Sequence, residues 1–246
     1  MMIRTLAPCL ALMLAGCSDS PDPATPALWQ VDCPGERQAW LFGTVHALER
    51  PADWRGDRLD KAMAESTLLM VELADPDNAK GAAKLWDRLA KRPGQASLSS
   101  RLQEESRPDL AKALYKTGLG DEDFADTETW AAALTLAQAS SRQLDSANGV
   151  DRAVIEAMRG TPVVELEGRE AQLAIFDRLP EKEQRDLLAA VVADAARSRD
   201  EASDIAAAWR RGDMTAIRAE TARGMLADPE LRQALFTGRN RRWSKR

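Results

Sequence analysis

Short apolar runs interrupt an otherwise amphipathic chain, and three of them have the length and composition of buried strands. They span residues 38–42 (QAWLF), 67–73 (TLLMVEL) and 161–166 (TPVVEL). Each run is too short for a helix, is rich in aliphatic or aromatic side chains, and ends near Gly, Pro or Asp. We therefore predict a buried strand at each position.

The segment between the first two strands has a helical pattern. Leu59, Ala62 and Met63 recur at helical spacing within residues 57–66. A strand, a helix and a strand in this order form a βαβ unit, whose strands are parallel and whose crossover is right-handed. We therefore expect the strands at 38–42 and 67–73 to be parallel.

The rest of the chain reads as helices, because apolar residues recur at three- and four-residue intervals between Gly and Pro breaks. The expected helices cover residues 78–92, 103–116 (one or two short helices), 127–144, 150–158, 171–179, 181–199, 205–211, 215–224 and 229–243. The sum predicts an α/β fold, close to α+β, with a small, mainly parallel sheet and extensive helical insertions. A single domain over residues 28–246 fits this pattern.

The first residues read as a targeting signal. Residues 1–16 contain Arg4 followed by an apolar stretch of signal-peptide length, and Cys17 follows Leu-Ala-Gly. This resembles the lipobox of bacterial lipoproteins, in which Cys17 would be acylated and residues 17–27 would form a Pro-rich tether. We expect a lipid-anchored, periplasm-facing protein of the bacterial cell envelope, and Ser18 favours the outer membrane. The alternative is a plain cleaved signal with an incidental Cys.

Composition narrows the function. The 246 residues are 44% hydrophobic and carry a formal net charge of −5, which argues against a general nucleic-acid binder. The single histidine, His46, excludes a site built from several histidines of one chain. Once Cys9 is removed and Cys17 acylated, Cys33 has no partner for an intrachain disulfide, so we expect a half-buried free thiol.

The candidate chemistry gathers at the strand ends. The first strand runs into Gly43 to His46, Glu72 ends the second, and Glu165 and Glu167 lie at the end of the third. In an open parallel sheet, ligands bind beyond the carboxyl ends of the strands. Imidazole with carboxylates suits a divalent metal, and it also suits acid–base catalysis without one. A capping role for His46 and a helix-dipole role for Glu167 remain the simpler alternatives.

The motifs together resemble the TraB/PrgY/GumN family, also called TIKI-like. The likeness rests on Gly43 to His46 as a GxxH motif, on Glu72, on Glu167 in its Leu-Glu pair, and on two short stretches. These stretches are Asn148-Gly149-Val150-Asp151 and the pair Arg239-Asn240.

The resemblance implies a fold similar to the erythromycin esterase and ChaN group and a peptidase-like hydrolysis of a peptide substrate. It implies that His46 and Glu72 hold a metal, manganese or cobalt rather than zinc, or activate water. Glu167 would then be a ligand or base, and Arg239, with Asn240, would steady a carboxylate or the oxyanion.

The sequence departs from the family pattern at one point, and this departure leaves two interpretations of the function. The pattern continues past Arg-Asn into a last strand and a second GxxH motif, which the sequence to Arg246 does not contain. We therefore expect a C-terminally incomplete or degenerate site. The two interpretations are a metal-dependent, peptidase-like hydrolase of the envelope and a non-catalytic envelope lipoprotein that binds a peptide, haem or a metal.

Overall fold

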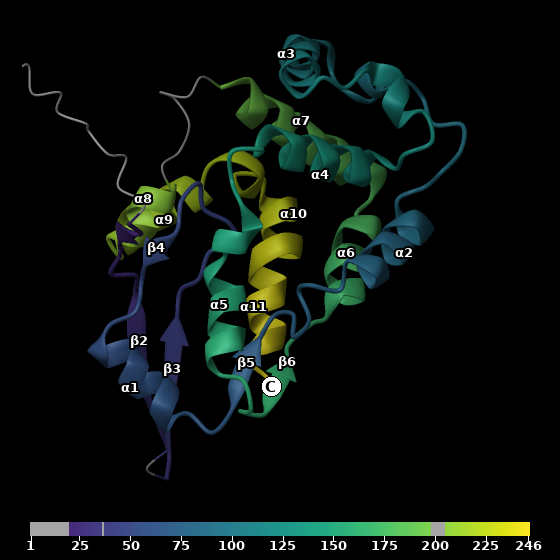
Figure 1. The fold of residues 1–246 in the computed structure, drawn as a ribbon. Helices are drawn as coiled ribbons and strands as arrows, with labels where there is room; N and C mark the ends of the chain where they lie inside the picture. Colours follow the sequence, from purple (N-terminus) through teal and green to yellow (C-terminus); the bar gives the residue numbers. More distant parts are fainter. Residues whose placement is uncertain (1–19, 36, 198–204) are drawn as a thin grey trace, which may run out of the picture.

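The computed structural model describes residues 20–35, 37–197 and 205–246, and within them the strands form three separate pairs (Figure 1). β2 (Leu28–Cys33) and β3 (Arg37–Phe42) form an antiparallel hairpin in which Leu28 faces Phe42. β5 (Leu69–Val71) and β6 (Val163–Glu165) are parallel. The short strands β1 (Asp22–Pro23) and β4 (Ala52–Asp53) are also parallel.

The expected βαβ unit is wrong in one of its strands. β3 pairs with β2 rather than with β5, because residues 29–33 alternate apolar and polar positions and form, with Leu28, a strand of their own. Gly35 has a φ of 77°, which lets the chain reverse tightly between the two strands. The described residues therefore form two-stranded sheets instead of one mainly parallel sheet, whereas the parallel pair at 69–71 and 163–165 confirms that part of the prediction.

The described part of the expected tether, residues 20–27, is hydrogen-bonded to the folded body. Asp22 pairs with Ala52 in the β1–β4 ladder, and its carboxylate contacts Arg50 at 3.6 Å and Arg210 at 3.2 Å. Thr25 donates its backbone N–H to the carbonyl of Arg210 at 2.7 Å. The expected signal peptide and Cys17 lie outside the described residues.

The helices follow the expected order, although several are shorter than predicted. They are α1 (Asp57–Glu65), α2 (Ala79–Leu89), α3 (Arg107–Thr117), α4 (Thr129–Ser140), α5 (Val150–Ala157), α6 (Arg169–Asp177), α7 (Glu181–Ala196), α8 (Ile205–Arg210), α9 (Met214–Thr221), α10 (Pro229–Arg232) and α11 (Gly238–Trp243). A π-helical turn at Gln233–Thr237 joins α10 to α11. Short 3₁₀ turns lie at Leu98–Arg101, Glu104–Ser106, Asp121–Phe124, Ser146–Asn148 and Gly224–Leu226.

Two hydrophobic clusters hold these elements together. The larger is helical and centres on α4, whose Trp130 is fully buried and meets Trp86 of α2 edge-on at 5.4 Å. The smaller cluster lies under the strands and joins Leu48, Val150 and Val154 of α5, and Trp209 of α8. Figure 1 shows the layer of α3, α4 and α7 at one end of the molecule and the hairpin β2–β3 at the other.

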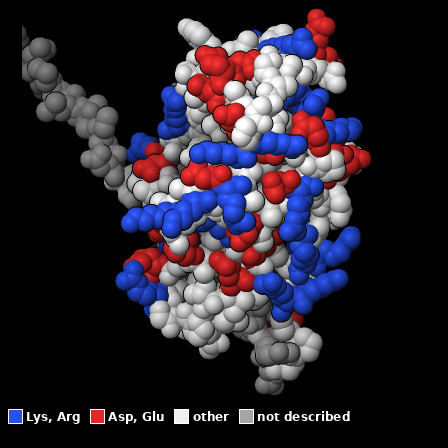
Figure 2. Space-filling model, turned by 90° about the vertical axis from the view of Figure 1, so that its right-hand side faces the viewer, with Lys and Arg blue, Asp and Glu red and all other residues white. Residues whose placement is uncertain are grey.

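Three further features of the described residues are the charge on the surface, the character of the helices and the state of Cys33. Figure 2 shows basic and acidic side chains interleaved over one face. Among the described residues, several ion pairs join side chains three or four positions apart on a helix, such as Lys182 with Asp186. Within the described ranges, no helix has both the length and the apolar character needed to cross a bilayer. Cys33 is free and half-buried, as expected.

Candidate functional site

The loop after β3 places His46 at the N-terminus of α5. Trp209 donates its indole N–H to the carbonyl of Gly43 at 2.8 Å, and Val150 donates its backbone N–H to the carbonyl of Val45 at 2.8 Å. Gly149 packs so closely on this loop that a Cβ there would overlap the carbonyl oxygen of His46. The Asn-Gly pair of the sequence therefore has a steric reason in its glycine, which permits this approach.

His46 forms a hydrogen-bonded pair with Asp151, the second residue of α5. Its Nδ1 lies 3.0 Å from Oδ2 of Asp151. An ionised carboxylate only accepts hydrogen bonds, so Nδ1 is the donor and Nε2 is the nitrogen that can take up or release a proton. The imidazole is 78% exposed, against 25% for the Asp151 side chain, so a partly shielded carboxylate orients a solvent-accessible ring.

The pKa values of this pair shift in opposite directions. The hydrogen bond to Asp151 is the largest influence on the pKa of His46 and raises it above 6.5, helped by the charges of Asp151 and Glu72 and opposed by burial and Arg239. Burial is the largest influence on the pKa of Asp151 and would raise it. The hydrogen bond and charge of His46, with backbone N–H groups, outweigh burial and lower this pKa.

The second part of the site is a pair of carboxylates joined by one guanidinium. β5 and β6 are parallel, and beyond them the backbone N–H of Glu167 donates to the carbonyl of Glu72 at 3.3 Å. Nη2 of Arg239 donates to Oε2 of Glu72 and to Oε2 of Glu167, each at 2.8 Å. Nε of Arg239 adds bonds of 3.1 and 3.0 Å to the two oxygens of Glu167.

The two carboxylates differ in what they can still do. The Glu167 side chain is 5% exposed and also faces Arg242 at 3.5 Å, so its charge is fully compensated. The Glu72 side chain is 38% exposed, and its contacts in the described part of the chain, with Arg239 and with Nε2 of Gln172 at 3.2 Å, use Oε2. Oε1 of Glu72 is therefore the oxygen open to a further hydrogen bond.

Local helix geometry aims Arg239 at these carboxylates. The π turn at Gln233–Thr237 directly precedes the helix that carries Arg239, and such turns are frequent at functional sites. A Cβ at Gly238 would lie 2.7 Å from the carbonyl oxygen of Gln233. The guanidinium stacks on Trp243 at 4.8 Å, and its pKa rises because the bond to Glu167 and the two carboxylate charges outweigh burial, the largest opposing influence.

The donor set does not fit a resident divalent metal. Across the described ranges, no group of three or more His, Cys, Asp or Glu side chains is arranged to hold one. Glu72, the expected partner of His46 in metal binding, is paired with Arg239 through Oε2, and His46 is bonded to Asp151 through Nδ1. These contacts leave Nε2 of His46 and Oε1 of Glu72, two donor atoms where a resident metal usually takes at least three from the protein. A fixed guanidinium supplies the positive charge between the carboxylates, and a divalent cation there would be repelled by it.

The remaining sequence-predicted residues lie apart from this cluster. Asn240 is exposed on α11, and the described contacts place no side-chain hydrogen bond between it and the cluster. Glu165 accepts the backbone N–H of Ala74 at 2.8 Å and so braces the loop after β5. Asn148 donates to the carbonyl of Leu48 at 3.1 Å. The sequence named Asp151 as the end of the Asn-Gly-Val-Asp stretch and left its place in the site open, and it gave no signal for Gln172.

Comparisons with known proteins agree with the sequence motifs. The model described as the TraB/PrgY/gumN family matches residues 27–246. Two curated relatives, both described as "Uncharacterized protein YbaP", come from Shigella flexneri and Escherichia coli (strain K12), and each is 29% identical over 156 residues. The match covers 62% of this chain and 56% of each relative, so the chain spans little more than half their length. No solved structure matches the chain.

Proposed function

The chain belongs to the TraB/PrgY/gumN family, and from that premise we propose that it is a hydrolase of the bacterial cell envelope that activates water at His46, Asp151 and Glu72. The observation that carries the proposal is the 3.0 Å contact between Nδ1 of His46 and Oδ2 of Asp151. It leaves Nε2 as the proton acceptor, on a ring whose pKa is raised above 6.5. The raised pKa makes Nε2 a stronger base than a free imidazole, and imidazole is the side chain that most often serves as a general base.

Each residue then has a defined part in the hydrolysis of a peptide bond. Nε2 of His46 accepts a proton from a water molecule as its oxygen attacks the carbonyl carbon. Asp151 stabilises the imidazolium that results, and His46 returns the proton to the leaving nitrogen. Oε1 of Glu72 accepts the second hydrogen bond of the attacking water and orients it.

Arg239 and Glu167 serve as positioning residues in this scheme. Glu167 is buried and holds Arg239 through three hydrogen bonds, so the guanidinium has one orientation. Arg239 in turn holds Oε2 of Glu72 at 2.8 Å. Because removing a group that orients a reactive partner can cost about 100-fold in rate, we expect both residues to affect turnover without touching substrate.

The proposal also includes attachment to the membrane and a fold related to the erythromycin esterase and ChaN group. Acylation of Cys17 would attach the chain to the membrane, with its domain in the periplasm. A core related to the erythromycin esterase and ChaN group is supported by the parallel β5–β6 pair with carboxylates beyond it. The scheme differs from the metal-dependent form expected from the sequence, because His46 is bonded to Asp151 through Nδ1 and Glu72 is bonded to Arg239 through Oε2.

A second candidate function is binding without turnover. The observation that favours it is the saturation of Glu167 and of one Glu72 oxygen by Arg239, which resembles a structural ion-pair network. An envelope protein of this kind would hold a peptide, haem or a metal and leave it unchanged. Turnover separates the two candidates, since both predict binding.

Peptide hydrolysis by the purified full chain tests the proposal. A mixture of short peptides is incubated with wild type, His46→Asn and Glu72→Gln, and products are identified by mass spectrometry. We expect cleavage by wild type and a loss of at least about 100-fold in each variant. Glu65→Gln, at the exposed end of α1, is the matched control. Equal rates in wild type and His46→Asn, or no cleavage at all, would leave the binding function.

A further inference from the structure

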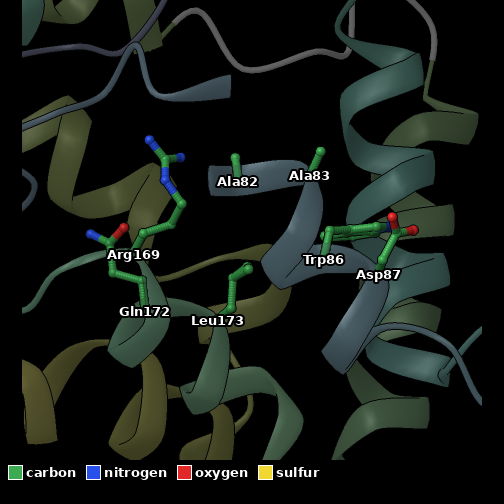
Figure 3. Close-up of a pocket in the computed structure, with 7 residues that line it drawn as sticks. All are labelled: Ala82, Ala83, Trp86, Asp87, Arg169, Gln172 and Leu173. Carbon is green, nitrogen blue, oxygen red and sulfur yellow. The ribbon is translucent and has the colours of Figure 1, made fainter. Parts of the chain in front are cut away.

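A cavity of about 380 Å³ opens between α2 and α6, outside the cluster described above. Its lining residues are Ala82, Ala83, Trp86, Asp87, Arg169, Gln172 and Leu173. Figure 3 shows Ala82 and Ala83 on one side, Leu173 and Gln172 on the other, and Arg169 and Trp86 at opposite ends. Its volume lies at the lower end of the range for small-ligand sites, about 300–1,000 Å³, which suits one or two amino-acid residues.

Gln172 connects this cavity to the proposed site. Its side chain lines the cavity, and its Nε2 donates to Oε2 of Glu72 at 3.2 Å. The connection is short because Gln172 lies one turn into α6, the helix that begins directly after Glu167 and Gly168. A molecule in the cavity therefore lies one side chain away from Glu72.

The cavity carries one oriented positive charge. Nη2 of Arg169 donates to the carbonyls of Asp75 at 2.9 Å and Pro76 at 3.0 Å, which fixes the guanidinium. In the part of the chain that the structure describes, no carboxylate forms an ion pair with Arg169, whereas Asp87 pairs with Lys91 at 3.0 Å. An oriented guanidinium with donors to spare is a receptor for a carboxylate.

Other residues that line the cavity are apolar, so a ligand that fills it needs an apolar group as well as a negative charge. Ala82 and Leu173 bring small and branched aliphatic surface to the cavity, and Trp86 adds an indole. The Trp86 ring packs on the fully buried Trp130 at 5.4 Å, so this end of the cavity is anchored in the helical core. A ligand that satisfies the whole wall has an aliphatic group close to a carboxylate.

We propose that this cavity binds the C-terminal residue of a peptide, with its carboxylate on Arg169 and an aliphatic side chain against Trp86 and Leu173. The inference rests on the proposed function and makes it more specific: the peptide bond before that residue is the one presented to Glu72. Its hydrolysis consumes one water and releases a free amino acid and the shortened peptide.

Equilibrium binding tests the pocket without relying on turnover. The probes are acetyl-Ala-Ala-Leu with a free carboxylate, the same peptide as its C-terminal amide, and 4-methylpentanoate as the carboxylic acid alone. Binding to the full chain is followed by calorimetry, and mass spectrometry of the same samples records whether the peptide is cleaved. We expect the free acid to bind at least tenfold more tightly than the amide and than 4-methylpentanoate.

Two variants and a control locate the binding. Ala82→Phe fills the cavity from α2, and Arg169→Gln removes the positive charge. Each variant should therefore bind the peptide with a free carboxylate at least tenfold more weakly than wild type. Arg159→Gln, an exposed arginine on the turn after α5, should leave it unchanged. Equal affinity for acid and amide, no effect of Ala82→Phe, or no binding would overturn the proposal. If 4-methylpentanoate binds as tightly as the peptide, the ligand of the cavity is a simple branched carboxylic acid and not a peptide.

The same measurements keep the two proposals separate. Preferential binding of the free acid without any cleavage contradicts the hydrolase and supports the pocket. Cleavage of peptides with no preference for a free C-terminus, and with full activity in Ala82→Phe, contradicts the pocket and leaves the hydrolase.

Discussion

Replacing Arg239 with Gln removes the side chain that, among the described residues, is bonded to both Glu72 and Glu167. Wild-type Arg239 is 21% exposed and makes three hydrogen bonds to Glu167 and one to Glu72. The neutral amide of Gln is shorter and cannot reproduce the paired contact. Glu167, whose side chain is 5% exposed, would keep only Arg242, at 3.5 Å.

The cost follows from the burial of Glu167. Breaking a buried ion pair on one side costs about 3–5 kcal/mol, because the remaining charge is left uncompensated. Arg242 and the partial exposure of Glu72 lessen the penalty, so we expect a loss of about 3 kcal/mol in the free energy of unfolding. With an m-value of about 3 kcal/mol/M, the urea midpoint falls by about 1 M.

Urea unfolding followed by circular dichroism at pH 7 and pH 4.5 is the assay. The matched control is Arg242→Gln, which removes a neighbouring arginine that is 58% exposed and should cost less than about 1 kcal/mol. Glu167→Gln added to Arg239→Gln removes the uncompensated charge and should recover part of the loss. Acidification should also narrow the difference from wild type, because an unpaired buried carboxylate is protonated more readily.

Two results would refute this reasoning. The first is a cost for Arg239→Gln no larger than that for Arg242→Gln, which would mean that the ion pair is as weak as a surface one. The second is a double variant less stable than Arg239→Gln alone, which would mean that the charge of Glu167 is not the source of the penalty.

Further predictions concern the loop that carries His46. Asp151→Asn should cost about 0.2–1 kcal/mol at pH 5 and little at pH 9 in urea unfolding, because the raised pKa of His46 stabilises the fold below about 6.5 and this gain is lost as pH rises through the folded value. The lowered pKa of Asp151 sets the other limit, since its contribution is lost only as pH falls below about 3.8. The same variant should move the acidic limb of the pH–rate profile to lower pH, and an unmoved limb would exclude His46 as the base. Gly149→Ala should cost about 1–3 kcal/mol in thermal unfolding, because its Cβ would overlap the His46 carbonyl; an unchanged midpoint would contradict that close approach.

Local patterns predicted the helices and one strand pair. The runs TLLMVEL and TPVVEL each carry a Glu at the position before the last, and Glu167 follows the second run. The two runs form parallel neighbours, so the chain beyond them brings Glu72 and Glu167 together. The partner of β3 was not predicted, because pairing depends on which strand lies close in space. The alternation of apolar and polar residues over 29–33 was the available signal, and it favours the hairpin that the structure shows.

The sequence predicted several residues of the candidate site but not the contacts between them. The sequence marked His46, Glu72, Glu167 and Arg239, but periodicity does not show which charges pair. Arg239 lies 72 residues from Glu167 along the chain, and a π turn, which the sequence pattern does not predict, directly precedes the helix that carries it. The sequence held a signal for Asp151, because this residue ends the Asn-Gly-Val-Asp stretch and lies in the first turn of a helix.

The measurement that most directly tests acid–base chemistry without a resident metal is peptide hydrolysis by the full chain after exhaustive chelation, with metal counted in the same sample by mass spectrometry. The account predicts that chelated wild type, with far less than one metal per chain, keeps its rate, and that His46→Asn loses it. Activity that disappears on chelation and returns with stoichiometric manganese or cobalt would contradict the account and restore the metal-dependent interpretation.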